Sequence, residues 1–261
     1  MKGKFINKPL FGLQRKSTKN LFIVFTIVIS LLAVIITALY PVMVDAVDLM
    51  PSELKSLISM NSIGEYFNAE GVEFILLIAI FATALAVNIT TNEFKNGSYE
   101  LIYTLNLSRG EIIRTKLLRL ITSIFYIDVI SCVVTLVSML IFGYGDFSVV
   151  NLLIYFLIAL VVTLQIGVII FSLCLINKKH FNTFGALMIV VVMYLFTMLS
   201  SMSSEVEGLG YLSPMSSLKG TIMTEGFKGM FTNGILLGVW SVISILLLIV
   251  SAKKFQNDDL C

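Results

Sequence analysis

The chain has 261 residues, of which 57% are hydrophobic and only 13% are charged, and its formal net charge is +2. Soluble domains carry about 25% charged residues, so this composition excludes a large soluble domain and indicates a membrane protein. The single histidine and three cysteines argue against a metal site or a disulfide framework, because no pair is spaced like zinc ligands.

Six apolar runs are long enough to cross a membrane, which takes about 20 apolar residues for about 30 Å of hydrocarbon. The runs do not alternate as strands do, and helices satisfy their own backbone in lipid. The predicted fold is therefore all-α, a polytopic membrane protein with one transmembrane domain over residues 1–261. We place the spans at residues 21–43, 74–90, 117–142, 149–176, 184–202 and 233–252. The second is the shortest and could begin earlier or run on toward Glu93.

Residues 1–20 contain six basic side chains and no acidic one. Leu10, Phe11 and Leu13 lie among them, a pattern that predicts an amphipathic interfacial helix at the headgroup level. The alternative is a disordered basic leader that only sets topology.

Fifteen of the 18 basic residues fall in alternate segments, on the side of both termini. The excess predicts that both termini are cytoplasmic, in a cell inner or plasma membrane.

The first outer loop, about residues 44–73, is acidic and contains MPSELKSLISM, where Pro51 begins a predicted small amphipathic helix. The third outer loop, about residues 203–232, carries YLSPMSSLKG.

Within the spans, Gln165 is predicted to donate an interhelical hydrogen bond. Gly234 and Gly238 form a G-x-x-x-G pattern that permits close approach of helices.

A charged, helix-forming segment lies between spans two and three. Gly97 and Ser98 form a break, Glu100 follows in the first turn of a helix, and apolar residues recur at helical spacing: Tyr99, Leu101, Ile102 and Leu105. Ser108 and Glu111 then form a capping box that starts a new helix into span three. A short helix with an exposed apolar face could lie on the lipid surface or dock into a groove of another protein.

The stretch NEFKNGSYELIYTLNLSRGEIIRTKLL, with the six spans and the basic leader, resembles the permease subunit of bacterial ABC type-2 exporters. The matching positions are Glu93, Gly97, Ser98, Glu100, Ser108, Arg109 and Lys116. Residues 211–218, YLSPMSSL, resemble the LSP segment that this family places before its last span. Asn106 stands where the family usually has proline, a departure that implies a less rigid turn.

The resemblance implies a cytoplasmic coupling helix set into a cleft of an ATP-hydrolysing subunit. Its coupling residues would be Gly97, Ser98, Tyr99, Glu100, Leu101, Ile102, Leu105, Ser108 and Arg109. The chain has no G-x-x-x-x-G-K-[ST] loop to hold a phosphate, so the P-loop ATPase that binds ATP and Mg would be a separate partner. A second copy, or a related permease, would complete the exporter. The chain itself is expected to hold no cofactor or metal, to have no catalytic residue and to bind no nucleic acid.

Asp128 is the one acidic residue deep in a span, roughly 16 Å along the helix from Leu117 at 1.5 Å per residue. Ser131, Thr135 and Ser138 share its face. Such a stripe should face protein or a water-filled path. We therefore assign Asp128, Ser131 and Thr135 to a translocation path, and a structural hydrogen bond is the alternative.

The function predicted first is the membrane-spanning subunit of an exporter whose cargo is amphipathic or apolar, such as an antimicrobial or toxin-like peptide. An intramembrane enzyme would need a metal cluster or paired catalytic residues, whereas Asp128 is alone. A membrane anchor or sensor would share the charged segment without needing ATP. A carrier that works alone typically contains an inverted repeat, and we detect none in the sequence.

Overall fold

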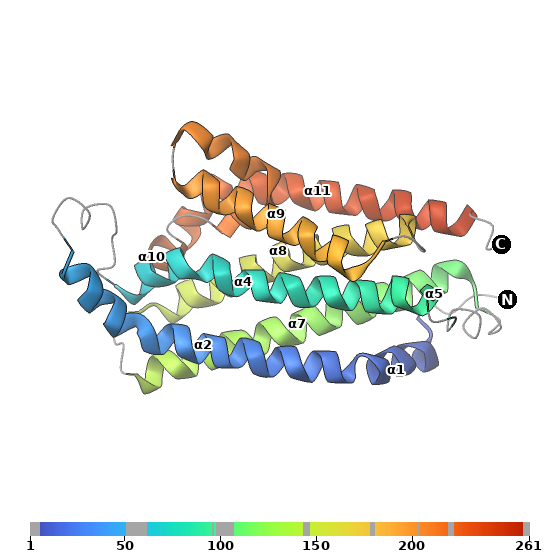
Figure 1. Cartoon of the computed structure of the whole chain (residues 1–261), viewed down its shortest axis with the longest axis horizontal. Helices are drawn as coiled ribbons and strands as arrows, with labels where there is room; N and C mark the ends of the chain where they lie inside the picture. The colour runs from blue at the N-terminus through green and yellow to red at the C-terminus, as the bar shows by residue number, and fades with distance from the viewer. Residues whose placement is uncertain are drawn as a thin grey trace.

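The computed structural model describes residues 6–50, 62–95, 97, 107–142, 147–177, 181–202, 204–218 and 222–257. In this part of the chain the structure is a bundle of long helices without strands (Figure 1). The six long helices are α2 (Lys19–Asp48), α4 (Ile63–Val87), α7 (Arg109–Ile141), α8 (Val149–Ile176), α9 (Thr183–Met202) and α11 (Phe227–Asn257). All six contain a segment long and apolar enough to span a membrane. The predicted all-α polytopic fold is confirmed.

The helices extend further than the predicted spans. The second span begins earlier and runs on toward Glu93, the alternative that the sequence left open, because its apolar segment covers Gly71–Thr91. Its helix α4 begins at Ile63 and continues beyond Val87 through a π-helical turn, η1 (Asn88–Asn92), and α5 (Glu93–Lys95). Ser62 caps the start of α4 by accepting a hydrogen bond of 3.2 Å from the Glu65 backbone. An apolar run identifies only the lipid-crossing part of a helix, so the polar turns at the helix ends are not included in the predicted span. The amphipathic helix predicted from Pro51 lies outside the described residues.

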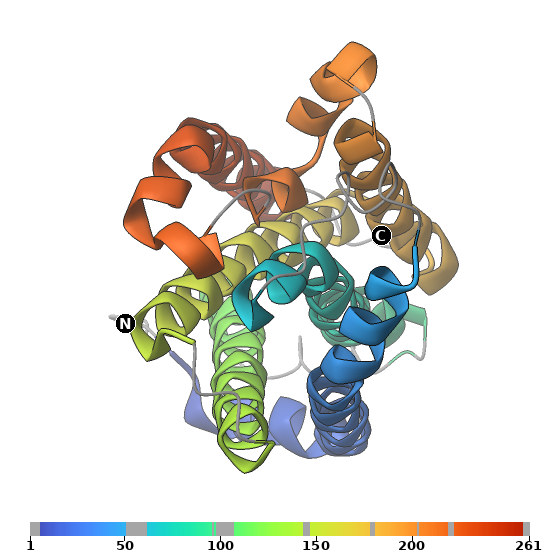
Figure 2. The ribbon, with the colours of Figure 1, turned by 90° about the vertical axis from the view of Figure 1, so that its left-hand side faces the viewer.

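Helices α4 and α8 lie inside the bundle, whereas α2, α9 and α11 lie at its outside (Figure 2). Two thirds of the most apolar window is buried in both α4 and α8 (67%), against 11% in α11. At Gly167 of α8, a Cβ atom would stand 2.9 Å from the Cδ1 atom of Ile124 on α7. The absence of a side chain there lets the two helices approach closely.

Polar contacts join α8 to α11. Gln165 Nε2 donates to the Leu237 carbonyl at 2.9 Å and to Ser241 Oγ at 2.8 Å, which confirms the predicted interhelical hydrogen bond. The close helix approach that Gly234 and Gly238 would permit is not seen within the described chain, because a Cβ atom at either would meet nothing within 4 Å. Their faces are open within the described chain, so their pattern does not mark an intrachain helix contact here.

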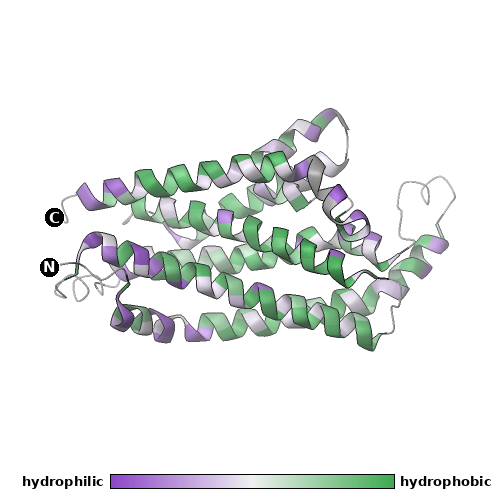
Figure 3. Ribbon diagram, turned by 180° about the vertical axis from the view of Figure 1, so that it is seen from behind, coloured by the Kyte–Doolittle hydropathy of each residue, from purple (hydrophilic) through white to green (hydrophobic). Residues whose placement is uncertain are grey.

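Both termini lie at one end of the bundle, which we call the terminal end (Figure 1). Hydrophilic residues gather toward the ends of the helices and apolar residues fill the middle (Figure 3). Helix α1 (Lys8–Ser17) precedes α2 at the terminal end and packs against α7, with Leu10 buried. The predicted N-terminal helix is present. Its place at the headgroup level and the cytoplasmic position of the termini remain predictions.

The predicted third outer loop is folded into the opposite end of the bundle. It forms η2 (Ser204–Leu212), η3 (Pro214–Leu218) and α10 (Ile222–Glu225), and every residue of η3 is buried. Thr197 of α9 donates a 2.8 Å hydrogen bond to Ser213, and Asn151 of α8 donates one of 3.0 Å to the Met223 carbonyl. Buried irregular backbone is tolerated at such a place because protein surrounds it.

Candidate functional site

The N-cap and the first three turns of α7, residues 108–119, contact several other helices at the terminal end of the bundle. We call these residues the α7 base. Ser108 has extended backbone angles and accepts a 3.3 Å hydrogen bond from the Glu111 backbone, as the sequence predicts for an N-cap. The helix therefore starts at Arg109, the last of the predicted coupling residues.

Lys116 joins the α7 base to the end of α4. Its ammonium group forms an ion pair with the Glu93 carboxylate and donates a 2.6 Å hydrogen bond to the Ile89 carbonyl. Ile89 lies in the π-helical turn, where the regular i to i−4 bonding is interrupted and a carbonyl can accept from a side chain. The two charged side chains are mostly buried, with 5% and 17% of their surface exposed. The pair thus connects the two sides of residues 96–107.

Three further residues of the α7 base form hydrogen bonds with other parts of the chain. Arg109 Nη1 donates to the Gln256 carbonyl at 2.8 Å, at the end of α11. The Asn7 backbone, at the N-cap of α1, donates to Thr115 Oγ1 at 3.1 Å. Arg119 donates to Thr18 Oγ1, between α1 and α2, from Nε at 3.2 Å and from Nη2 at 2.8 Å. The α7 base is therefore connected to α1, α2, α4 and α11.

The predicted coupling residues are only partly described. Gly97 is exposed and has a φ angle of 70°, a left-handed conformation that favours glycine and fits a chain break. Ser108 and Arg109 form the start of α7. The other predicted residues lie outside the described part of the chain: Ser98, Tyr99, Glu100, Leu101, Ile102 and Leu105. The short coupling helix itself therefore stays a prediction.

The predicted polar face of α7 points into protein. Asp128, Ser131 and Thr135 are each at most 4% exposed. The Ser131 hydroxyl donates to the Ile127 carbonyl of its own helix at 2.7 Å. Within the described chain, Asp128 Oδ1, Thr135 Oγ1 and the hydroxyl of Tyr155 on α8 have no hydrogen-bond partner. Buried polar atoms without partners are costly, so this region of the core is the second candidate site.

Sequence reasoning singled out Glu93 and Lys116 separately and missed that they pair. It also missed the bond from Arg119 to Thr18. The signal available was the presence of Lys116 and Arg119 at the start of the third apolar run, where a basic side chain must find a partner or reach the membrane surface. Among the described residues, no group of three or more His, Cys, Asp or Glu side chains could hold a metal ion.

No protein-family model matches the chain, and no curated protein matches it.

Proposed function

We propose that this chain is the membrane-spanning permease subunit of an ATP-driven exporter of the ABC type-2 kind. A separate P-loop ATPase would dock on residues 97–107, and two permease chains would together enclose the route for cargo. The observation that carries the proposal is the ion pair of Glu93 with Lys116, because it joins the two helices that flank the proposed docking segment.

This pair gives the docking segment a stiff connection to the bundle. The segment follows α5, which contains Glu93, and precedes Ser108 at the N-cap of α7, and Lys116 binds these two sides together. A displacement of residues 97–107 would therefore reach α4 and α7 together instead of being absorbed by a loose loop. Through Arg109 and Arg119 it would reach α11 and the junction of α1 with α2.

The proposed route for cargo follows the polar face of α7. Asp128, Ser131 and Thr135 supply polar groups on one face of α7 within the bundle. The scarcity of polar groups in the spans favours an amphipathic or apolar cargo, such as an antimicrobial or toxin-like peptide.

A membrane anchor or sensor is the second candidate, because a partner could dock on residues 97–107 without hydrolysing ATP.

Affinity purification of the tagged chain from its native membrane in mild detergent tests the proposal. We expect a stoichiometric P-loop ATPase to accompany the chain. Leu101→Asp with Leu105→Asp places two charges on the proposed docking face and should abolish both its retention and its stimulated hydrolysis. The control pair is Leu49→Asp with Leu212→Asp, two exposed leucines outside the terminal end.

Two outcomes contradict the proposal. A chain that purifies alone, even after crosslinking, would favour an anchor or a self-sufficient carrier. A complex that survives the Leu101 and Leu105 changes, with transport intact, would show that the ATPase does not dock on this segment.

A further inference from the structure

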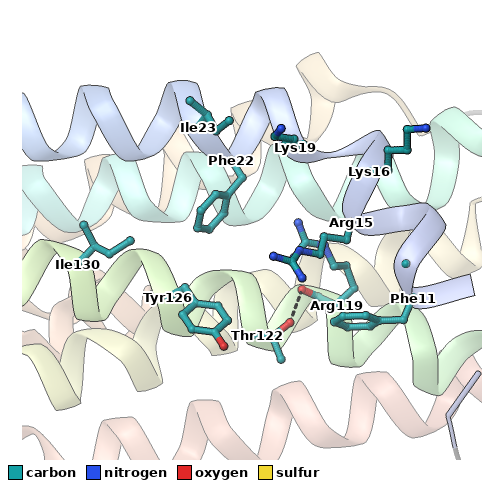
Figure 4. A pocket seen from close by; sticks show the side chains of 11 residues that line it. Phe11, Arg15, Lys16, Lys19, Phe22, Ile23, Arg119, Thr122, Tyr126 and Ile130 are labelled. Atoms are coloured by element: carbon teal, nitrogen blue, oxygen red, sulfur yellow. Dashed lines mark hydrogen bonds between the residues drawn. The ribbon is translucent and has the colours of Figure 1, made fainter. Parts of the chain in front are cut away.

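A pocket of about 720 Å³ opens at the terminal end, between α1, α2 and α7. Figure 4 shows the side chain of Arg15 on α1 reaching toward the guanidinium of Arg119 on α7. Phe22 of α2 and Tyr126 of α7 lie beside them. Of the residues that line this pocket, the proposed coupling to an ATPase uses Arg119 alone, and the polar face around Asp128 uses none.

One end of the pocket is strongly basic. Its cationic lining residues are Arg15, Lys16, Lys19 and Arg119, and none of the described residues that line it is acidic. Arg15 and Arg119 are close enough for their positive charges to repel each other. Arg15, Lys16 and Lys19 form no ion pair within the described part of the chain. Like charges gathered without a counter-charge attract an anion, since an anion relieves their repulsion.

Hydrogen bonds to Thr18 fix the Arg119 side chain at the basic end of the pocket. Its side chain is buried, with 6% exposed, and Thr18 accepts hydrogen bonds from its Nε and Nη2 groups. Its Nη1 group makes no hydrogen bond within the described chain. The side chain of Arg15 lies beside this guanidinium (Figure 4). A planar guanidinium with free donors suits the oxygen atoms of a phosphate.

The other end of the pocket is apolar. Phe22 and Ile23 of α2 and Tyr126 and Ile130 of α7 line it. Ile130 lies about 16 Å beyond Arg119 along the helix, at 1.5 Å per residue, so the lining runs toward the hydrocarbon. Tyr126 and Ile23 are 57% and 42% exposed, so the pocket opens outward, to the side where lipid would lie.

We propose that this pocket binds one phospholipid with an anionic phosphate headgroup, in the leaflet at the terminal end. The phosphate lies between Arg15, Lys19 and Arg119, and an acyl chain lies along Tyr126 and Ile130. Basic pockets between membrane helices recognise anionic headgroups in this way. The lipid would bridge α1 and α7, so it would fix the interfacial helix on the α7 base. This inference does not depend on the proposed exporter function.

Native mass spectrometry of the full-length chain, delipidated in mild detergent, tests the inference. The probes are dioleoyl phosphatidylglycerol and dioleoyl phosphatidylcholine, which share acyl chains and differ in net headgroup charge. We expect preferential retention of one phosphatidylglycerol. Arg15→Gln with Lys19→Gln should reduce its occupancy about 10- to 30-fold, the effect of two basic groups near an anionic surface.

The matched control is Lys253→Gln with Lys254→Gln, which removes the same charge from exposed positions on α11. This pair should retain the lipid as the unmodified chain does. Equal loss from both pairs would overturn the inference, because the attraction would then be unspecific, and so would equal retention of both lipids. Displacement of phosphatidylglycerol by glycerol 3-phosphate at equal concentration would also overturn it, since the site would then take a soluble phosphate.

Discussion

Lys116 shows how one side chain can decide the geometry of the terminal end. Its charge lies almost wholly inside the protein and is neutralised by Glu93, while the Ile89 carbonyl accepts a further hydrogen bond. Removing one member of a mostly buried pair leaves the other charge without its partner, which costs more than the pair contributes as a whole.

Lys116→Met should therefore destabilise the chain by about 3 kcal/mol, because Glu93 and the Ile89 carbonyl lose their shared partner. Thermal unfolding of the purified chain in detergent measures the loss. Glu93→Gln with Lys116→Met should recover part of it, since no buried charge is then left alone. Lys95→Met is the control, because Lys95 is exposed. Equal melting temperatures for Lys116→Met and Lys95→Met would contradict the prediction.

At the scale of elements, the contact of α4 with α8 depends on a glycine. A Cβ atom at Gly71 of α4 would stand 2.0 Å from the hydroxyl of Tyr155 on α8. Tyr155 is fully buried and packs edge-on against Phe156, so it has little room to move. The large aromatic side chain of one helix fills the space that glycine leaves on the other.

Gly71→Ala should thus destabilise the bundle by about 1–3 kcal/mol, the usual cost of overpacking a core. Gly238→Ala on α11 is the matched control, because its Cβ atom would meet open space and alanine favours helices by up to about 1 kcal/mol. Adding Tyr155→Phe to Gly71→Ala should restore part of the stability by removing the hydroxyl. Thermal unfolding compares the three. The packing argument fails if Gly71→Ala unfolds at the same temperature as Gly238→Ala.

For the whole molecule, six membrane-crossing helices place both termini at one end of the bundle. Fifteen of the 18 basic residues are assigned to that side by the predicted topology. The positive-inside rule therefore predicts that the terminal end faces the cytoplasm. Both the ATPase docking and the leaflet assigned to the bound lipid would follow from this orientation.

Labelling of intact cells with a membrane-impermeant maleimide tests the orientation in a Cys261→Ser background. Leu49→Cys, 88% exposed in the unmodified chain, should react from outside. Lys253→Cys should react only after the membrane is permeabilised. Cys132 and Cys174 are buried and provide the low background. The reverse pattern would invert the topology and remove the proposed docking segment from the cytoplasm.

The sequence predicted the helices because each span is a local property. Twenty apolar residues in a row must form a helix in lipid, whatever lies beside them. The Ser108 cap and the polar face of Asp128 are local too, since helical periodicity alone places their residues. The extent of α4 was underestimated because Ile63 to Glu73 mixes polar with apolar residues and continues the helix outside the apolar run.

Tertiary structure alone decided which of these groups meet. Lys116 reaches Glu93 across 23 positions, and Arg119 reaches Thr18 across 101, distances at which no sequence periodicity operates. The burial of Pro214–Leu218 and the open faces of Gly234 and Gly238 depended likewise on how the helices pack. The sequence by itself determined that the chain forms six apolar helices. The packing of those helices determined the α7 base and the basic pocket beside it, because both are built from contacts between separate helices.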